Sequence, residues 1–262
     1  MKKIIYRILA YIIDIAIVTL LTIGFMYLPF NKSNNEKVGS IYVNISTNEL
    51  EYETLTNKLN TYYEDAKFSE DELKDIETDF PAYYNCFKDI KAEEEVTNEI
   101  KSDLEKNLKI NYVDIKNDYA YQINKLNVNE TIVGFVFYIL YFGVLQYFLK
   151  GQTLGKKIFK LKVKGINDKK ISIFNYILRS VLVCEILVTG IDLIFLLTMK
   201  ESLYIDCNYW ILQVKYIYEI GFIVVMIIRD DARSVHDLIL GTEVVRLEKN
   251  SLKDEKNTDK TN

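Results

Sequence analysis

Residues 4–28 read IIYRILAYIIDIAIVTLLTIGFMYL, and in this run of 25 residues only Arg7 and Asp14 are charged. A helix needs about 20 mostly apolar residues to cross the hydrocarbon core of a bilayer. The run follows the sequence MKK, as the core of a secretory signal peptide would. It is longer than such a core, however, contains Asp14 and precedes no small-x-small cleavage site. We therefore predict a transmembrane helix rather than a cleaved signal.

Three further apolar runs occupy residues 131–149, 173–199 and 209–228, whereas residues 31–129 are polar and acidic. The mean hydropathy of the chain is close to zero because these two populations average out. The pattern predicts an all-α membrane protein with four transmembrane helices in the lipid bilayer and an insertion between the first and the second. Residues 248–262 are predicted to form a disordered polar tail.

Lysine and arginine residues predict the orientation of these helices, because cytoplasmic loops carry more of them. Residues 150–172 hold eight lysines and one acidic residue. Arg229 and Arg233 follow the last apolar run directly. Residues 31–129, in contrast, contain 12 lysines, no arginine and 21 acidic residues. We expect a protein of the cell membrane with both termini cytoplasmic and with the insertion extracytoplasmic.

The insertion, residues 31–129, carries apolar side chains at helical spacing, most regularly between Val96 and Leu126. STNE at 46–49 and SEDE at 69–72 have the S-x-x-E form of a capping box, which begins a helix. We predict two or three antiparallel helices. The segment lacks histidine and its acidic residues are scattered, so we expect no metal site there. It is a candidate for binding an extracytoplasmic partner.

Several ionisable residues fall inside the predicted spans, where a charge is costly and marks either a function or a buried pair. Arg7 and Asp14 are seven residues apart, which places them on one face of the first helix. Glu185 and Asp192 have the same spacing in the third span and are expected to share a face there.

Lys215 and Glu219, in the fourth span, are spaced for an intrahelical ion pair. Two interpretations of all these charges are open. The carboxylates could handle protons or cations, because a carboxyl group in a medium of low dielectric can exchange a proton for a cation. Alternatively, arginine–carboxylate pairs only fasten the helices together. The candidate polar network comprises Arg7, Asp14, Arg179, Glu185, Asp192 and Glu219.

Two cytoplasmic segments are predicted to form strands. GQTLGKK, at residues 151–157, is one residue shorter than a phosphate-binding loop, and no Ser or Thr follows its lysines. The following IFKLKVK, residues 158–164, alternates apolar residues with lysines, as a strand does. TEVVRL at 242–247 has a similar composition, and the two are expected to pair. The lysines could contact anionic lipid headgroups or only fix the topology.

The stretch IRDDARSVHDLILGT, residues 228–242, contains the single histidine of the chain. Ser234 and Asp237 have nearly the spacing of a capping box, and Gly241 stands where a short helix would end. Asp237 either caps this helix or completes a polar cluster with the first span. His236 is expected to be a polar residue at the membrane interface.

Three cysteines, Cys86, Cys184 and Cys207, do not form a disulfide framework. Cys86 and Cys207 both lie outside the predicted spans, so either they pair or they are free thiols, and we favour free thiols. The chain has no nucleophile–histidine–acid pattern, no Cys/His metal spacing and no redox motif. We expect no enzyme, no catalytic residue, no cofactor, no metal and no nucleic-acid partner.

Three motifs together resemble the RDD family of integral membrane proteins, which is named for an arginine and two aspartates. They are RILAYIID at 7–14, GQTLGKKIFKLKV at 151–163 and RSVHDLILGTEVV at 233–245. The motif residues carried over by this resemblance are Arg7, Asp14 and Asp237. Arg179 resembles a further arginine found at the start of the third helix.

The resemblance covers residues 4–28 and 131–247, and leaves out the insertion. It implies an integral membrane protein for which transport of a solute, or exchange of cations and protons, has been proposed. The leading hypothesis is therefore transport of a small cation or other small solute through the buried charges, with proton coupling. Four helices are few to enclose a pathway, so we expect a homo-oligomer. The alternative is a non-transporting scaffold or sensor whose 31–129 segment binds an extracytoplasmic partner.

Overall fold

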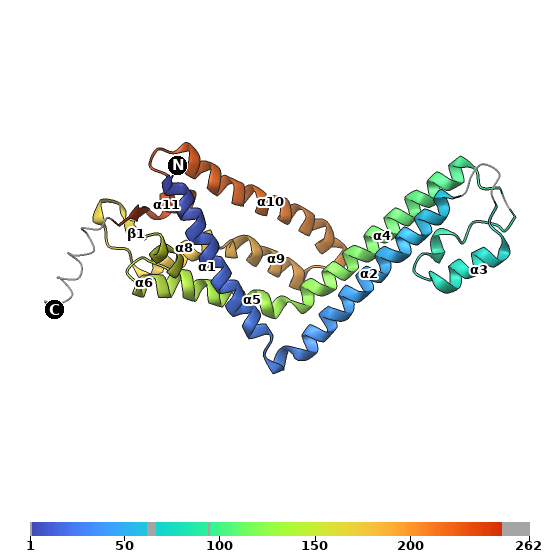
Figure 1. Cartoon of the computed structure of the whole chain (residues 1–262), viewed down its shortest axis with the longest axis horizontal. Coiled ribbons are helices and arrows are strands. Elements are labelled where there is room, and N and C mark those ends of the chain that lie inside the picture. The colour runs from blue at the N-terminus through green and yellow to red at the C-terminus, as the bar shows by residue number, and fades with distance from the viewer. Residues whose placement is uncertain (1, 62–66, 94, 248–262) are drawn as a thin grey trace. The chain divides into compact units, whose positions relative to one another are not determined.

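The computed structural model describes residues 2–61, 67–93 and 95–247; the predicted tail, 248–262, lies outside them. The chain folds into two compact units. We call residues 32–126 the inserted unit, and residues 1–31 with 127–262 the membrane unit. The insertion was predicted as residues 31–129; residue 31 and residues 127–129 belong to the membrane unit instead. Figure 1 shows the course of the chain through both units.

Among the described residues of the membrane unit, three helices are long and apolar enough to cross a bilayer. They are α1 (Lys2–Met26), the continuous helix Val128–Phe148, and α10 (Glu201–Ile228). Val128–Phe148 consists of α5 (Val128–Tyr138), a π-helical stretch (Ile139–Leu145) and the short α6 (Gln146–Phe148). Apolar side chains on these helices are widely exposed, with Leu20 at 69 % and Ile217 at 71 %. Such surfaces suit contact with lipid rather than water.

The third predicted span is broken rather than a single helix over 173–199. It consists of α8 (Ile173–Val183) and α9 (Ile186–Thr198), which meet at an angle of 65°. Glu185 lies at the break with a φ of 55°, a left-handed conformation that no helix continues through. The membrane unit therefore has four spans if the bent pair counts as one.

The fourth predicted span, 209–228, begins eight residues too late. The helix α10 starts at Glu201 and includes the polar residues before the apolar run. Hydropathy marks the part of a helix that suits lipid, whereas the helix itself continues as long as its backbone bonds do. Only Met199 and Lys200 separate α9 from α10.

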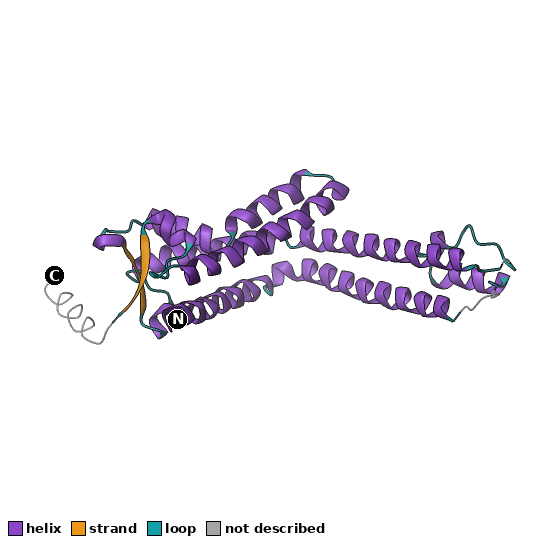
Figure 2. Cartoon of the chain, turned by 90° about the horizontal axis from the view of Figure 1, so that it is seen from above, coloured by secondary structure: helices purple, strands orange, loops and turns teal. Residues whose placement is uncertain are grey.

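The predicted pair of strands is present. The strands β1 (Leu161–Gly165) and β2 (Thr242–Arg246) form a small sheet (Figure 2). They are antiparallel, with Val163 opposite Val244. Leu161, Val163 and Val244 are buried against Ala10 of α1 and Tyr176 of α8. The alternating pattern began earlier in the sequence, at residue 158, but that residue ends the short helix α7 (Leu154–Ile158). The remaining elements of this end are the 3-10 turn η4 (Ile166–Asp168) and the helix α11 (Val235–Leu240).

The inserted unit is a long pair of antiparallel helices, α2 (Lys32–Asn60) and α4 (Asn98–Leu126), which lie side by side (Figures 1 and 2). Tyr52 of α2 stacks on Tyr112 of α4 with ring centroids 4.5 Å apart. A small cap of α3 (Glu70–Asp79) and the 3-10 turn η2 (Tyr84–Cys86) completes the unit. Its core contains Leu55, Leu59, Phe68, Ile76, Tyr83, Phe87, Val96, Leu104 and Leu108.

One of the two predicted capping boxes is present in this unit. Ser69 and Glu72 form a complete box at the start of α3. The STNE stretch at 46–49 begins no helix, because it lies in the middle of α2, where the Ser46 hydroxyl bonds back to the Tyr42 carbonyl at 3.1 Å. The four-residue pattern is local, and the long apolar stripe of α2 outweighs it.

Candidate functional site

Asp237 holds two arginines from two other helices. Its Oδ2 accepts a hydrogen bond from Nη2 of Arg7 on α1 at 2.6 Å, and its Oδ1 accepts one from Nη1 of Arg179 on α8. Thr242 of β2 bridges the same group, accepting from Arg179 at 2.8 Å and donating to Asp237 at 3.1 Å. The Asp237 side chain is completely buried. One carboxylate thus joins α1, α8 and α11.

The charges around Asp237 fix its ionisation. Burial would raise the pKa of this carboxyl group, but the guanidinium groups of Arg179 and Arg7 outweigh that effect and hold the pKa well below its ordinary value. Burial lowers the pKa of His236 well below 6.5, and its ring stacks on Phe222 with centroids 5.4 Å apart. The histidine is therefore neutral at pH 7 while the aspartate is charged.

Ser234, His236 and Asp237 do not form a hydrolytic triad. The Ser234 hydroxyl lies 2.8 Å from Nε2 of His236, and the same nitrogen lies 3.7 Å from Oδ1 of Asp237. A triad needs the carboxylate on the opposite ring nitrogen, where it can orient the imidazole. The three residues instead begin α11: Ser234 and Asp237 form the capping box predicted for them, and Gly241 ends the helix with a φ of 62°.

Asp14 is held by a second, separate cluster. It accepts hydrogen bonds from the Tyr141 hydroxyl at 2.7 Å, from the backbone N–H of Gly155 at 2.7 Å and from the Thr153 hydroxyl. The ammonium group of Lys156 lies 3.9 Å away. Asp14 does not pair with Arg7, although both were predicted on one helical face. Partners from Val128–Phe148 and α7 neutralise it instead.

This cluster explains the GQTLGKK segment. Thr153 caps α7, and Gly155 allows that helix to approach α1. A Cβ atom at Gly155 would lie 2.2 Å from the carbonyl oxygen of Ala10 and 2.9 Å from the Asp14 carboxyl carbon. The segment resembles an anion-binding loop because it does bind an anion, but that anion is a carboxylate of its own chain.

Two acidic residues lie near the break in the third span. Glu185, at the break, and Glu219 of α10 lie within hydrogen-bonding reach of each other. Lys215 pairs with Glu185 at 3.5 Å, not with Glu219 as its spacing predicted, because the left-handed turn brings Glu185 toward α10. A hydrogen bond between two carboxyl groups requires one proton between them.

The carbonyl groups freed by this break are bonded by tyrosines. The Tyr218 hydroxyl donates to the Leu182 carbonyl at 2.6 Å, and the Tyr11 hydroxyl donates to the Val183 carbonyl at 3.0 Å. A free carbonyl at membrane depth would be costly. Tyrosines from α1 and α10 therefore stabilise a break that the backbone of α8 could not maintain alone.

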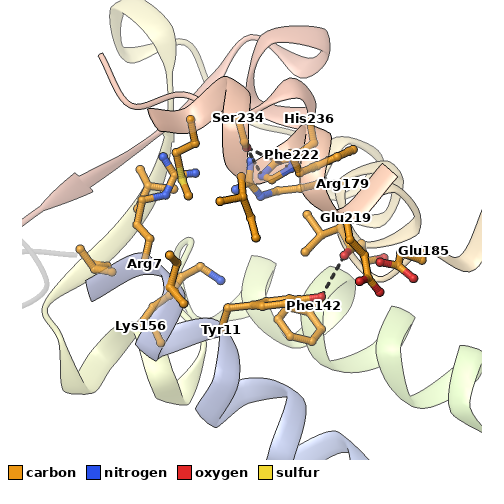
Figure 3. A pocket seen from close by; sticks show the side chains of 18 of the residues that line it. Arg7, Tyr11, Phe142, Lys156, Arg179, Glu185, Glu219, Phe222, Ser234 and His236 are labelled. Carbon is orange, nitrogen blue, oxygen red and sulfur yellow. Dashed lines mark hydrogen bonds between the residues drawn. The ribbon is translucent and has the colours of Figure 1, made fainter. Parts of the chain in front are cut away.

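A cavity of about 330 Å³ lies between these groups. Figure 3 shows Arg7 and Lys156 on one side of it and Glu185 and Glu219 on the other, with Arg179 above. Its volume is within the range of about 300–1,000 Å³ that is common for small-ligand sites. Apolar side chains, including Phe222, form much of the remaining wall.

Four of the six residues of the predicted polar network line this cavity: Arg7, Arg179, Glu185 and Glu219. Asp14 does not, since its own cluster encloses it. Asp192 does not either, and it lies on α9 against the buried Tyr204. Glu185 precedes the first residue of α9 in a left-handed conformation and pairs with Lys215 of α10, whereas Asp192 lies within α9.

Lys156 is the lining residue that the sequence did not reveal. It was one of eight similar lysines that follow the second span. Burial lowers the pKa of its ammonium group to about 8, and Asp14 opposes this effect. The adjacent Gly155 was the available signal, because a glycine often marks a close helix contact that draws its neighbours inside.

One of three comparisons with known proteins found a match. The family model described as RDD family matches residues 114–241. The match starts inside α4, within the segment predicted to lie outside the resemblance, and runs to the end of α11; Arg179 and Asp237 fall inside it, while Arg7 and Asp14 precede it. No curated protein matched the chain. No solved structure matched it either. The predicted resemblance to the RDD family is confirmed over residues 114–241, the part of the chain that includes Arg179 and Asp237.

Proposed function

We propose that this protein moves a small cation or other small solute across the cell membrane, coupled to protons, through the cavity between α1, α8, α10 and α11. The proposal includes four spans, cytoplasmic termini and an extracytoplasmic inserted unit. It includes no enzymatic step. The observation that carries it is the cavity itself, where basic and acidic side chains from distant parts of the chain meet beside a broken span: Arg7, Lys156, Arg179, Glu185 and Glu219.

A simple fastening role explains these groups poorly. Asp237 and its two arginines do join helices, but Glu185 and Glu219 place two acids together where an apolar pair would be less costly. Broken helices at membrane depth are tolerated where they are buried in protein or line a cavity, and in transporters such breaks form the binding site. The break at Glu185 has this position.

The two acids also supply a proton carrier. We propose that this pair exchanges a proton for a bound cationic group, as a carboxyl group in a medium of low dielectric can. Movement of the solute is thereby coupled to movement of a proton in the opposite direction. One chain forms the cavity, and we propose that a homo-oligomer completes the pathway, since four spans are few to enclose one.

Purified full-length protein in sealed vesicles tests this function. We expect flux of sodium ion or of a small organic solute, with dissipation of an imposed pH gradient. Glu219→Gln is expected to lower the flux on the order of tenfold or more, the effect of losing one charge-assisted contact. Asp192→Asn is the matched control, because it removes an intramembrane acid that lies off the cavity, and it should retain flux.

Equal loss in both variants would show that any intramembrane acid is needed for folding, and would contradict the role of the cavity. If the protein moves no ion or solute that is tested, the transport proposal is wrong. That outcome would favour the alternative, a non-transporting scaffold or sensor whose inserted unit binds an extracytoplasmic partner.

The orientation is tested by cysteine labelling. Glu93 is an exposed residue of the inserted unit. Glu93→Cys, in a chain whose native cysteines are replaced by serine, is expected to react with a membrane-impermeant maleimide in intact cells. A cysteine at Lys157, on the lysine-rich side, is the control and should react only after lysis. The reverse pattern would invert the proposed topology.

A further inference from the structure

The cavity has unlike ends, and this difference identifies a class of solute if the proposed function holds. Arg7 and Lys156 stand at one end (Figure 3), and the guanidinium group of Arg179 belongs with that of Arg7 because both bind Asp237. Two carboxylates lie behind them, Asp237 against the arginines and Asp14 near the lysine. Three positive charges face two negative charges, so this end has one positive charge in excess.

The other end has the opposite excess. Glu185 and Glu219 both line it, and the ammonium group of Lys215 reaches only the first of them, at 3.5 Å. Two carboxyl groups against one ammonium leave one negative charge, or one proton in its place. Figure 3 shows these carboxyl oxygens on the side of the cavity opposite the nitrogens of Arg7 and Lys156.

The wall between the two ends is mostly apolar, and includes Val183, Phe222, Ile223 and Met226. Charges act more strongly across such a medium than across water. A solute that fills the cavity displaces water from both ends. It therefore binds well only if it presents an anionic group to one end and a cationic group to the other. An uncharged group would remove water from the charged side chains at its end and form no new charged contact with them.

We infer that the cavity takes small zwitterions, solutes with a carboxylate and an amino or ammonium group joined by a short apolar chain. The carboxylate lies toward Lys156 and Arg179, and the ammonium group lies toward Glu185 and Glu219. The inference rests on the proposed function, because it names the solute that the same cavity would move. On arrival the ammonium group binds between the two glutamates, which both line this end of the cavity.

Three solutes with the same four-carbon skeleton isolate the charge pattern from size: 4-aminobutanoate, butanoate and butylammonium. Binding to the full-length protein in detergent is measured by calorimetry and by the rise in melting temperature. We expect 4-aminobutanoate to bind on the order of tenfold more tightly than either singly charged analogue, as the loss of one charge-assisted contact predicts. A chain-length series from glycine to 6-aminohexanoate should show an optimum.

Lys156→Met tests the cationic end. The variant is expected to bind 4-aminobutanoate no better than butylammonium, while butylammonium itself binds as in the parent protein. Lys157→Met is the matched control: its side chain is exposed and does not line the cavity, so the preference for the zwitterion should persist. Unchanged butylammonium binding in Lys156→Met also shows that the variant is folded.

The pH dependence gives a second readout that needs no substitution. Lys156 faces Asp14 and Arg7 of α1, Arg179 of α8 and the thiol of Cys184, and burial lowers its pKa to about 8. The ammonium form is present below that pH and is lost above it. The preference for 4-aminobutanoate over butylammonium is therefore expected to fall as the pH rises through about 8.

The outcomes separate the two proposals. Equal or tighter binding of butylammonium or butanoate, or the same preference after Lys156→Met, overturns the zwitterion inference. Sodium flux with no binding of any zwitterion in the series also overturns it, and leaves the proposed transport function intact. Absence of both flux and binding removes both proposals.

Discussion

Replacing Asp237 with asparagine is expected to lower the free energy of unfolding by about 3–5 kcal/mol, the usual effect of removing one partner from a buried ion pair. The side chain is completely buried and binds both Arg7 and Arg179. Asparagine keeps the shape but not the charge, so two guanidinium groups would remain buried with no carboxylate between them. Thermal and detergent-induced unfolding, followed by circular dichroism in micelles, measures the difference.

The chain contains a matched control for this variant. Asp231 also bonds to two arginines, Arg229 at 3.0 Å and Arg233 at 2.6 Å, but its side chain is exposed at 37 %. Asp231→Asn should leave the unfolding midpoint almost unchanged, because exposed ion pairs contribute little. Equal effects of the two substitutions would show that burial does not set the strength of the Asp237 cluster.

The same cluster makes stability depend on pH. The folded pKa of Asp237 lies below the unfolded value of about 3.9, so its contribution is present above that pH and is lost as the pH falls below it. His236, buried and neutral, adds a loss of stability below about pH 6.5, since the unfolded chain takes up that proton more readily. The Asp237→Asn variant should lose the first of these two dependences and keep the second.

Gly155→Ala is expected to lower the free energy of unfolding by roughly 1–3 kcal/mol, within the range for an overpacked core. The new methyl group would lie 2.2 Å from the Ala10 carbonyl oxygen, which belongs to a helix backbone and cannot turn aside as a side chain can. The helices α1 and α7 would have to separate, and the hydrogen bond from Gly155 to Asp14 would lengthen.

Gly24→Ala is the control for this substitution. Gly24 lies in α1, the helix that Gly155 contacts. Among the described residues, no atom lies within 4 Å of a Cβ atom added at Gly24. Alanine favours a helix more than glycine does, so this variant should be unchanged or slightly more stable. Equal destabilisation by the two alanines would contradict the close contact between α1 and α7.

These contacts show what the residues that resemble the RDD motif do in the fold. Two of the residues that resemble the motif, Arg7 and Asp237, pair with each other, although 230 positions separate them. The first aspartate, Asp14, does not join them and instead anchors the GQTLGKK segment. The three motifs that resemble the RDD family are therefore three parts of two buried clusters that hold α1, α7, α8 and α11 together.

Local features of the sequence were sufficient for much of the fold. Residues 4–28 predicted α1 because composition and length alone decide whether a helix suits lipid. The alternation after Gly155 predicted β1, and Ser234 with Gly241 predicted both ends of α11. Each of these patterns acts through neighbours a few residues apart, so the sequence displays it directly.

The sequence by itself determined which segments are apolar, where helices α3 and α11 begin, and which charges had to be explained. Only the tertiary structure decided the partner of each charge, the break at Glu185 and the entry of Lys156 into the cavity. These outcomes depend on which residues from distant segments come within about 4 Å, where a buried charge finds its compensation. Periodicity describes one helix at a time, so it could not show that Asp14 and Asp237 belong to different clusters.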